Sequence, residues 1–110
     1  MELYIGGYKQ GKLNYVLNIR NKAPEEVKND FHLWVRQLLE EQEDAEAVVE
    51  AYINEHPDCV IISDEIGNGI VPMDAFERSY REQLGRILIN LAQRADRVER
   101  VICGIGQRIK

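Results

Sequence analysis

Short apolar runs alternate with amphipathic stretches along this chain, and the order of the two predicts its fold. Met1 to Ile5 has the pattern of a short buried strand, and Cys59 to Ile62 is a second continuous apolar run with β-branched residues. Such runs are typical of parallel strands that helices cover on both faces. Val98 to Cys103 has a similar pattern, and a last extended segment is expected at Gln107 to Lys110.

Helical spacing marks the stretches between these runs. Lys12 to Lys22 is weakly amphipathic and follows the first strand. A second helix is expected to begin at Ala23-Pro24-Glu25-Glu26, because proline and acidic residues favour the first helical turn. The expected apolar face of this second helix is Val27, Phe31, Trp34, Val35 and Leu38.

Two further helices complete the pattern. One follows the acidic stretch Glu40 to Asp44 and ends before Pro57. The longest runs from about Asp74 to Ala95, with Glu77 in capping-box register and an apolar stripe on one side. Its stripe consists of Phe76, Tyr80, Leu84, Leu88, Leu91 and Ala95.

These elements predict a three-layer α/β fold with a small, mainly parallel sheet. The expected strands are Leu3 to Ile5, Cys59 to Ser63 and Val98 to Cys103, with the long helix as a right-handed crossover. The 110 residues are expected to form one domain, residues 1–110.

Composition narrows the classes of partner. The net charge of −5 provides no basic surface for nucleic acid, and no apolar run approaches the roughly 20 residues that span a bilayer. The N-terminus lacks the pattern of a signal peptide, so we expect a cytoplasmic protein without nucleic-acid or membrane partners. Cys59 and Cys103 are expected to be small core residues, as is usual in a reducing compartment.

The most specific candidate chemistry follows the first strand. Gly6, four further residues, Gly11 and Lys12 match the spacing G-x-x-x-x-G-K of a phosphate-binding loop. Glycines let backbone N–H groups approach phosphate oxygens, and the lysine adds a positive charge. The next residue, Leu13, lacks the hydroxyl that usually binds Mg²⁺ at this position. A plain turn between strand and helix is the competing interpretation.

Polar residues also follow the second predicted strand. Asp64 and Glu65 come at its carboxyl end, before a turn rich in glycine and proline, and ligands of open α/β sheets bind at this edge. The alternative is that both acids only solvate a loop. Arg78, Arg81 and Arg86 lie off the apolar stripe of the long helix, where they could face an anion or only water and glutamates.

Several of these segments resemble the adenosylcobinamide kinase/adenosylcobinamide-phosphate guanylyltransferase family. The strings ISDEIGNGIVP, SYREQLGR and RADRVERVICGIGQRIK are similar to its C-terminal half, and GGYKQGK resembles its opening loop. NDFHLWVRQLL resembles its acidic Walker B block, which would place Asp30 at the metal-binding aspartate and Trp34 at its tryptophan.

The resemblance implies a P-loop protein of cobalamin assembly, with a kinase activity and GMP transfer through a guanylylated histidine. Departures from the family pattern limit that expectation. The segment that carries the family's histidine is absent, and His32 and His56 are expected at the surface or at helix ends. The family's Asn before Glu is Asp64 here, and its Asn-Gln pair is Leu88-Ile89. EEVKN, residues 25–29, is too charged for a buried Walker B strand, so Asp30 is expected inside a helix.

Two hypotheses follow for function. The first is a shortened relative that binds ATP or GTP without guanylyl transfer, with kinase action and a cobinamide-type corrinoid ligand as further candidates. The second is a non-catalytic oligomeric binding or regulatory protein that keeps the fold. Lys12 and Glu65 are the candidate catalytic residues, and Asp30 is the candidate ligand of Mg²⁺. The expected nucleotide-binding residues are Gly6, Gly7, Tyr8, Lys9, Gln10, Gly11, Lys12, Leu13, Asp64 and Arg81.

A homo-oligomer is also expected, because a three-stranded sheet leaves edges and apolar helix surface without an intrachain partner. The apolar group Phe31, Trp34, Val35 and Leu38 suggests the interface, and Trp34 is expected to lie in it.

Overall fold

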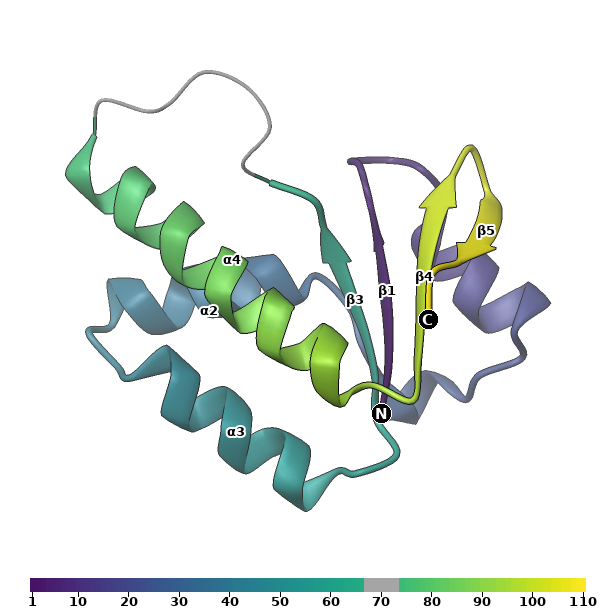
Figure 1. Cartoon of the computed structure of the whole chain (residues 1–110), viewed down its shortest axis with the longest axis horizontal. Helices are drawn as coiled ribbons and strands as arrows, with labels where there is room; N and C mark the ends of the chain where they lie inside the picture. Colours follow the sequence, from purple (N-terminus) through teal and green to yellow (C-terminus); the bar gives the residue numbers. More distant parts are fainter. Residues whose placement is uncertain (67–73) are drawn as a thin grey trace.

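A computed structural model describes residues 1–66 and 74–110 of the chain, and its sheet has five strands (Figure 1). The strand order is β2-β3-β1-β4-β5. The strands are β1 (Glu2–Gly6), β2 (Val27–Lys28), β3 (Val60–Asp64), β4 (Arg97–Ile102) and β5 (Ile105–Arg108). The helices are α1 (Lys12–Asn14), the π-helical η1 (Tyr15–Ile19), the 3-10 turn η2 (Pro24–Glu26), α2 (Phe31–Glu40), α3 (Ala45–Glu55) and α4 (Ala75–Arg94).

The three predicted strands form the centre of this sheet, and they are parallel. Strand β1 pairs with β3 on one side and β4 on the other, with Leu3 opposite Ile61 and Val98. Leu3 and Ile61 are almost fully buried, as expected for strands covered on both faces. The predicted parallel arrangement is therefore confirmed.

The sheet separates two apolar cores, because successive side chains of a strand point to opposite faces. Leu3 faces a large core formed with α2, α3 and α4, whereas its neighbour Tyr4 faces a smaller core with Tyr15 and Val16. In Figure 1 the long helix α4 lies on one side of the sheet, and the α1–η1 segment lies on the other. This arrangement confirms the three-layer α/β fold.

Helices α3 and α4 agree closely with their predicted ranges. Asp74 is the N-cap of α4, where its side chain accepts hydrogen bonds from the backbone N–H groups of Phe76 and Glu77. Helix α4 connects β3 to β4, as predicted. No helix in the described part of the chain is long and apolar enough to cross a membrane.

The stretch before Asp30 differs from prediction. Val27 and Lys28 form the edge strand β2, parallel to β3, and the helix begins only at Phe31. Asp30 is the N-cap of α2, in a left-handed conformation with φ 52°, and does not lie inside a helix. An edge strand needs only one buried face, so the charge of EEVKN did not prevent pairing.

The end of the chain forms an antiparallel hairpin that the pattern only partly predicted. Strand β5 lies at Ile105–Arg108, so it begins earlier in the chain than the segment expected at Gln107 to Lys110. Cys103 and Gly104 make the turn, with φ 51° and 74°. Positive φ at both central positions is characteristic of a type I′ hairpin turn. Cys103 is exposed, so its predicted core position is wrong, whereas Cys59 is buried as predicted.

The predicted oligomer interface does not exist as an exposed apolar patch. Phe31, Val35 and Leu38 are buried in the large core, where one face of α2 packs against β3 and α4. Trp34 is half-buried and packs edge-on against Phe31 and Tyr52. Homo-oligomerisation stays a prediction, but this surface does not provide the reason for it.

Candidate functional site

A pocket of about 210 Å³ lies where β1 and β3 end. The loop between β1 and α1 forms one wall, and the segment before α2 together with the end of β3 forms another. The lining residues are Tyr8, Lys9, Gln10, Gly11, Lys12, Leu13, Asn14, Asn29, Asp30 and Asp64. The pocket therefore contains most of the predicted nucleotide-binding residues and lies at the carboxyl edge of the parallel strands.

Two glycines allow the loop to adopt this shape. A Cβ on Gly6 would lie 2.4 Å from the Val101 carbonyl oxygen, a distance at which the backbone of β4 would have to move. Gly11 has φ 85°, which a residue with a side chain rarely adopts, and passes close to Gly104. Both requirements are structural, and both keep the backbone of the loop close to the sheet edge.

The Lys12 ammonium group lies under this loop. Its Nζ donates a hydrogen bond to the Gly7 carbonyl oxygen at 2.7 Å and lies 2.7 Å from Asp64 Oδ1. Lys12 is only 8% exposed, an unusual degree of burial for a lysine. Lys12 also lines the pocket, so a buried ammonium group paired with a carboxylate lies at this edge of the sheet.

The hairpin turn of β4 and β5 supports the loop from the other side. The backbone N–H of Cys103 donates to Gln10 Oε1 at 2.8 Å, and that of Gly104 donates to the Gln10 carbonyl oxygen at 2.7 Å. Gln10 thus uses both its side chain and its backbone to bind the turn. Gln10 lines the pocket, and these contacts are with the protein, so its role in nucleotide binding stays a prediction.

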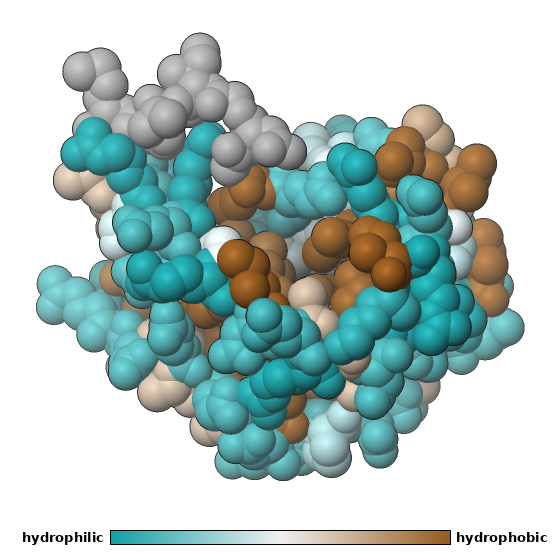
Figure 2. Space-filling model, viewed as in Figure 1, coloured by the Kyte–Doolittle hydropathy of each residue, from teal (hydrophilic) through white to brown (hydrophobic). Residues whose placement is uncertain are grey.

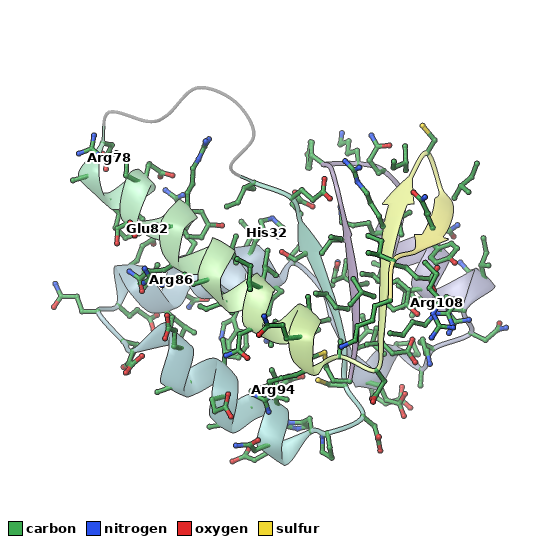
Figure 3. All side chains as sticks on the ribbon, viewed as in Figure 1. His32, Arg78, Glu82, Arg86, Arg94 and Arg108 are labelled. Carbon is green, nitrogen blue, oxygen red and sulfur yellow. The ribbon has the colours of Figure 1, made fainter. Side chains whose placement is uncertain are left out.

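His32 contacts the site from the first turn of α2, so the predicted helix-end position holds, but the alternative surface position is wrong. The residue is 8% exposed. In the view of Figure 3 the labelled His32 lies between α4 and β3. Its Nδ1 accepts a hydrogen bond from the Asp64 backbone N–H at 3.2 Å, and its Nε2 lies 3.4 Å from Asp64 Oδ2. An Nδ1 that accepts carries no proton, so in this arrangement the neutral ring carries its proton on Nε2.

Tyr80 of α4 fixes the first turn of α2 beneath His32. The Tyr80 hydroxyl donates a 2.8 Å hydrogen bond to the His32 carbonyl oxygen. Burial is the main cause that raises the pKa of Tyr80, to about 12, so the phenol remains a hydrogen-bond donor at neutral pH. Contacts through His32 and Asp64 thus connect α4 to Lys12, which follows the glycine loop.

Asp30 lines the same pocket from the end of the β2–α2 connection. Its side chain makes no capping hydrogen bond to α2, although aspartate often caps a helix in this way. The left-handed backbone of Asp30 is tolerated by aspartate better than by most residues. The structure therefore brings Asp30 and Asp64, two carboxylates with hard oxygen donors, to one pocket with Lys12.

The remaining predicted residues contribute less. Leu13 lines the pocket, is 39% exposed, and offers no oxygen ligand. Glu65 is not among the described residues that line this pocket, and its Oε2 pairs with Arg100 at 3.1 Å. Arg81 lies on α4 and is not among the described residues that line the pocket. The glycine-rich string after Ile66 falls on residues 67–73, outside the described residues.

The spacing of apolar residues around His32 is a sequence signal that it is buried. Phe31, His32, Val35 and Leu38 share the buried face of α2, so His32 stands on an apolar stripe. A buried histidine requires polar partners, and these partners come from β3. His56, by contrast, is exposed at the end of α3 and stacks on Tyr52, as expected for a helix-end residue.

Together, the parallel sheet, the glycine loop and its buried lysine define a three-layer α/β domain of P-loop-like architecture. The family model described as cobinamide kinase / cobinamide phosphate guanyltransferase matches residues 9–109. The chain therefore belongs to this family, and the resemblance stated from the sequence is confirmed.

Two curated relatives match over shorter stretches. The bifunctional adenosylcobalamin biosynthesis protein CobU of Salmonella typhimurium is 43% identical over 51 residues. The protein of the same name from Escherichia coli is 41% identical over 51 residues. Each match covers 46% of this chain and 28% of the relative, so it spans less than a third of the curated proteins.

Proposed function

We propose that the pocket between the glycine loop and Asp30 binds the phosphate groups of ATP or GTP, as part of a role in cobalamin biosynthesis. The single observation that carries this proposal is the buried Lys12 ammonium group, held by Gly7 O and Asp64 at the carboxyl edge of the sheet. Loop amides and a lysine are the groups that bind nucleotide phosphates, and a strand-end carboxylate is a common ligand of the accompanying Mg²⁺.

The size of the pocket supports phosphate groups as its occupant. About 210 Å³ is smaller than the roughly 300–1,000 Å³ of pockets that enclose a whole drug-sized ligand. The phosphates of a nucleotide would fill it, and the base and ribose would extend over the surface beyond. The pocket by itself does not discriminate ATP from GTP.

Mg²⁺ is the ion that this donor set suits. Mg²⁺ is usually bound by one or two carboxylates, by phosphate oxygens and by water. Asp30 would hold it, with Asp64 on the same pocket wall, and the bound ion would neutralise charge on the phosphates. The described residues contain no group of three or more histidine, cysteine or acidic side chains that could hold a metal alone. The ion would therefore arrive with the nucleotide.

The proposed reaction is a phosphoryl transfer of the kinase type, in which Lys12 binds the phosphates and stabilises the charge that develops on them. The acceptor would be a cobinamide-type corrinoid, following the family description. Guanylyl transfer is not included in the proposal. Both ring nitrogens of the buried His32 contact Asp64, and His56 lies at the far end of α3.

A second candidate function is a binding or regulatory protein without catalysis. Leu13 favours it, because a leucine provides no hydroxyl ligand where phosphoryl transfer depends on a well-fixed metal ion. Nucleotide would still bind to such a protein, but neither ATP hydrolysis nor phosphorylation of a corrinoid would follow. Turnover of radiolabelled ATP with and without cobinamide distinguishes the two functions.

Thermal denaturation with ATP or GTP tests the binding itself. A ligand at about 100 times its dissociation constant stabilises the folded state by roughly 2.7 kcal/mol, which raises Tm by more than about 10 °C in a domain of this size. Lys12→Ala should abolish most of this shift. The matched control is Lys22→Ala, which removes a lysine paired to Glu2 outside the pocket and should keep the shift. An unchanged melting curve at millimolar nucleotide would leave the loop as a plain turn.

A further inference from the structure

Asp64 occupies the position from which it can compete with a phosphate for Lys12. One of its carboxylate oxygens, Oδ1, lies 2.7 Å from Lys12 Nζ. The side chains are largely shielded from solvent, with 8% of Lys12 and 16% of Asp64 exposed. Limited exposure to water strengthens both the attraction within this pair and the repulsion between the carboxylate and any incoming anion.

Lys12 has few hydrogen-bond donors left for a phosphate. An ammonium group has three N–H donors, and the Gly7 carbonyl oxygen and Asp64 Oδ1 are both within hydrogen-bond distance of Nζ. A phosphate that takes its place at Nζ would also bring its charge beside the Asp64 carboxylate. Binding without a metal ion thus requires Lys12 to turn from Asp64, or the two anions to share one cation.

His32 contacts both the backbone and the side chain of Asp64. Its Nδ1 accepts from the Asp64 backbone N–H, and its Nε2 lies beside the second carboxylate oxygen, Oδ2. Backbone and side chain of one residue are thereby fixed against one ring, which directs the other oxygen, Oδ1, to Lys12. Tyr80 in turn anchors the His32 carbonyl oxygen, so the ring itself has a defined position.

We propose that Asp64 is a built-in competitor of phosphate for Lys12, and that His32 is the positioning residue that keeps it there. This inference rests on the proposed function, and it assigns a regulatory role to two residues of the same site. In this arrangement the loop binds metal-free polyphosphate weakly, because the lysine is already neutralised. A ligand that brings its own divalent cation avoids the penalty, since the cation offsets the Asp64 charge.

Titration calorimetry with inorganic tripolyphosphate in EDTA tests the competition without a base, a ribose or a metal ion. Asp64→Asn keeps the size of the side chain and removes its charge, and it should bind tripolyphosphate about tenfold more tightly than the wild type. The matched control is Glu46→Gln on α3, which removes one negative charge that pairs with Arg86 away from the pocket. It should change the affinity by less than about twofold.

Two His32 variants separate the positioning role from a structural one. His32→Gln retains an N–H donor that can reach Asp64 Oδ2 and should resemble the wild type. His32→Asn retains an acceptor for the Asp64 backbone N–H but loses the distal donor, and it should tighten tripolyphosphate binding part of the way to Asp64→Asn. When Asp64 is already Asn, His32→Asn should have no further effect. A merely structural role would not produce this dependence on the Asp64 charge.

Lys12→Ala distinguishes a failure of the phosphate site from a failure of the competition by Asp64. If tripolyphosphate binds to no protein of the set, including Asp64→Asn, or binds equally to Lys12→Ala, the phosphate site and this inference both fail. If binding requires Lys12 but Asp64→Asn equals the wild type, only the competitor role is refuted. Equal gains in Asp64→Asn and Glu46→Gln would also refute it, because net charge would then explain the effect.

Discussion

The Tyr15 hydroxyl donates a 2.5 Å hydrogen bond to Glu99 Oε1 inside the smaller core, although the two residues are 84 positions apart. Glu99 is 1% exposed, and its second oxygen, Oε2, pairs with Arg97 at 2.6 Å and with Arg20 at 3.3 Å. This buried carboxylate therefore connects η1, which follows the glycine loop, to strand β4. Its partners compensate the charge that burial would otherwise make costly.

Tyr15→Phe should lower the free energy of unfolding by about 1.5–3 kcal/mol, because it removes a buried donor from a charged acceptor. Urea denaturation measures the change. Tyr8→Phe is the matched control, since the Tyr8 side chain is 75% exposed and its hydroxyl should contribute almost nothing to stability. Equal, small effects of both substitutions would contradict a stabilising role for the Tyr15–Glu99 hydrogen bond.

Glu99 should also make stability depend on acid pH. Burial tends to raise the pKa of its carboxyl, but hydrogen bonds from Tyr15 and Arg97 outweigh burial and hold that pKa below its ordinary value. A lowered folded-state pKa gives stability that is fully present above the unfolded-state pKa of about 4.3 and is lost as pH falls through the folded value. Stability should therefore decline below about pH 4, and Glu99→Gln should show a smaller decline. A parallel decline in both proteins would assign the effect to other carboxylates.

Two glycines should respond to alanine in opposite directions. A Cβ on Gly106 would lie 2.2 Å from the Tyr15 phenol oxygen and 2.6 Å from Glu99 Oε1, so Gly106→Ala should lower Tm. Gly85 lies in α4 with no neighbouring atom within 4 Å of an added Cβ. Gly85→Ala should therefore raise the unfolding free energy by about 0.5–1 kcal/mol. A loss of stability in Gly85→Ala would contradict the packing described for α4.

Incubation with α-labelled GTP should leave the protein unlabelled. Transfer of GMP to histidine requires a ring nitrogen presented to the nucleotide, whereas Nδ1 of His32 accepts from Asp64 N and its Nε2 faces Asp64. His56 is exposed at the C-terminal end of α3, with its ring stacked on Tyr52. Stable label that disappears in His32→Asn or His56→Asn would overturn this prediction.

The sequence predicted the central sheet well because local pattern and tertiary environment agree there. Leu3 and Ile61 belong to continuous apolar runs, and both are buried in the large core, whereas the neighbouring side chains Tyr4 and Ile62 are buried in the smaller one. Lys12 could likewise be found from the spacing of its glycines, since the requirement for Gly6 and Gly11 is local. Such features need no knowledge of distant contacts.

Features that depend on distant contacts were missed. Val27 and Lys28 became an edge strand because β3 offered a free side, a fact that their own composition does not contain. The apolar pattern placed Cys103 in a strand, but two consecutive residues with positive φ turn the chain there. The role of His32 depends on Asp64, 32 residues away, and a single sequence does not show that these two side chains meet.

Figure 2 shows a further consequence of tertiary packing that the pattern could not predict. Apolar surface is visible at the centre of this face, between α4 and β4, in the region of a groove of about 440 Å³. Leu88 and Ile89 of α4 contribute to it, together with Ile66 after β3. The sequence placed Leu88 on the buried stripe of α4, whereas it is only partly buried at the edge of the large core.

Isothermal titration of ATP and GTP, each with and without Mg²⁺, is the most direct test of nucleotide binding at the Lys12 pocket. We expect one nucleotide per chain in the presence of Mg²⁺, with affinity at least about tenfold weaker in Lys12→Ala and unchanged in Lys22→Ala. Binding without Mg²⁺ should be weaker, because Asp64 then holds Lys12. An absence of binding heat at millimolar nucleotide in the wild type, or equal affinities for the wild type and Lys12→Ala, would contradict the account.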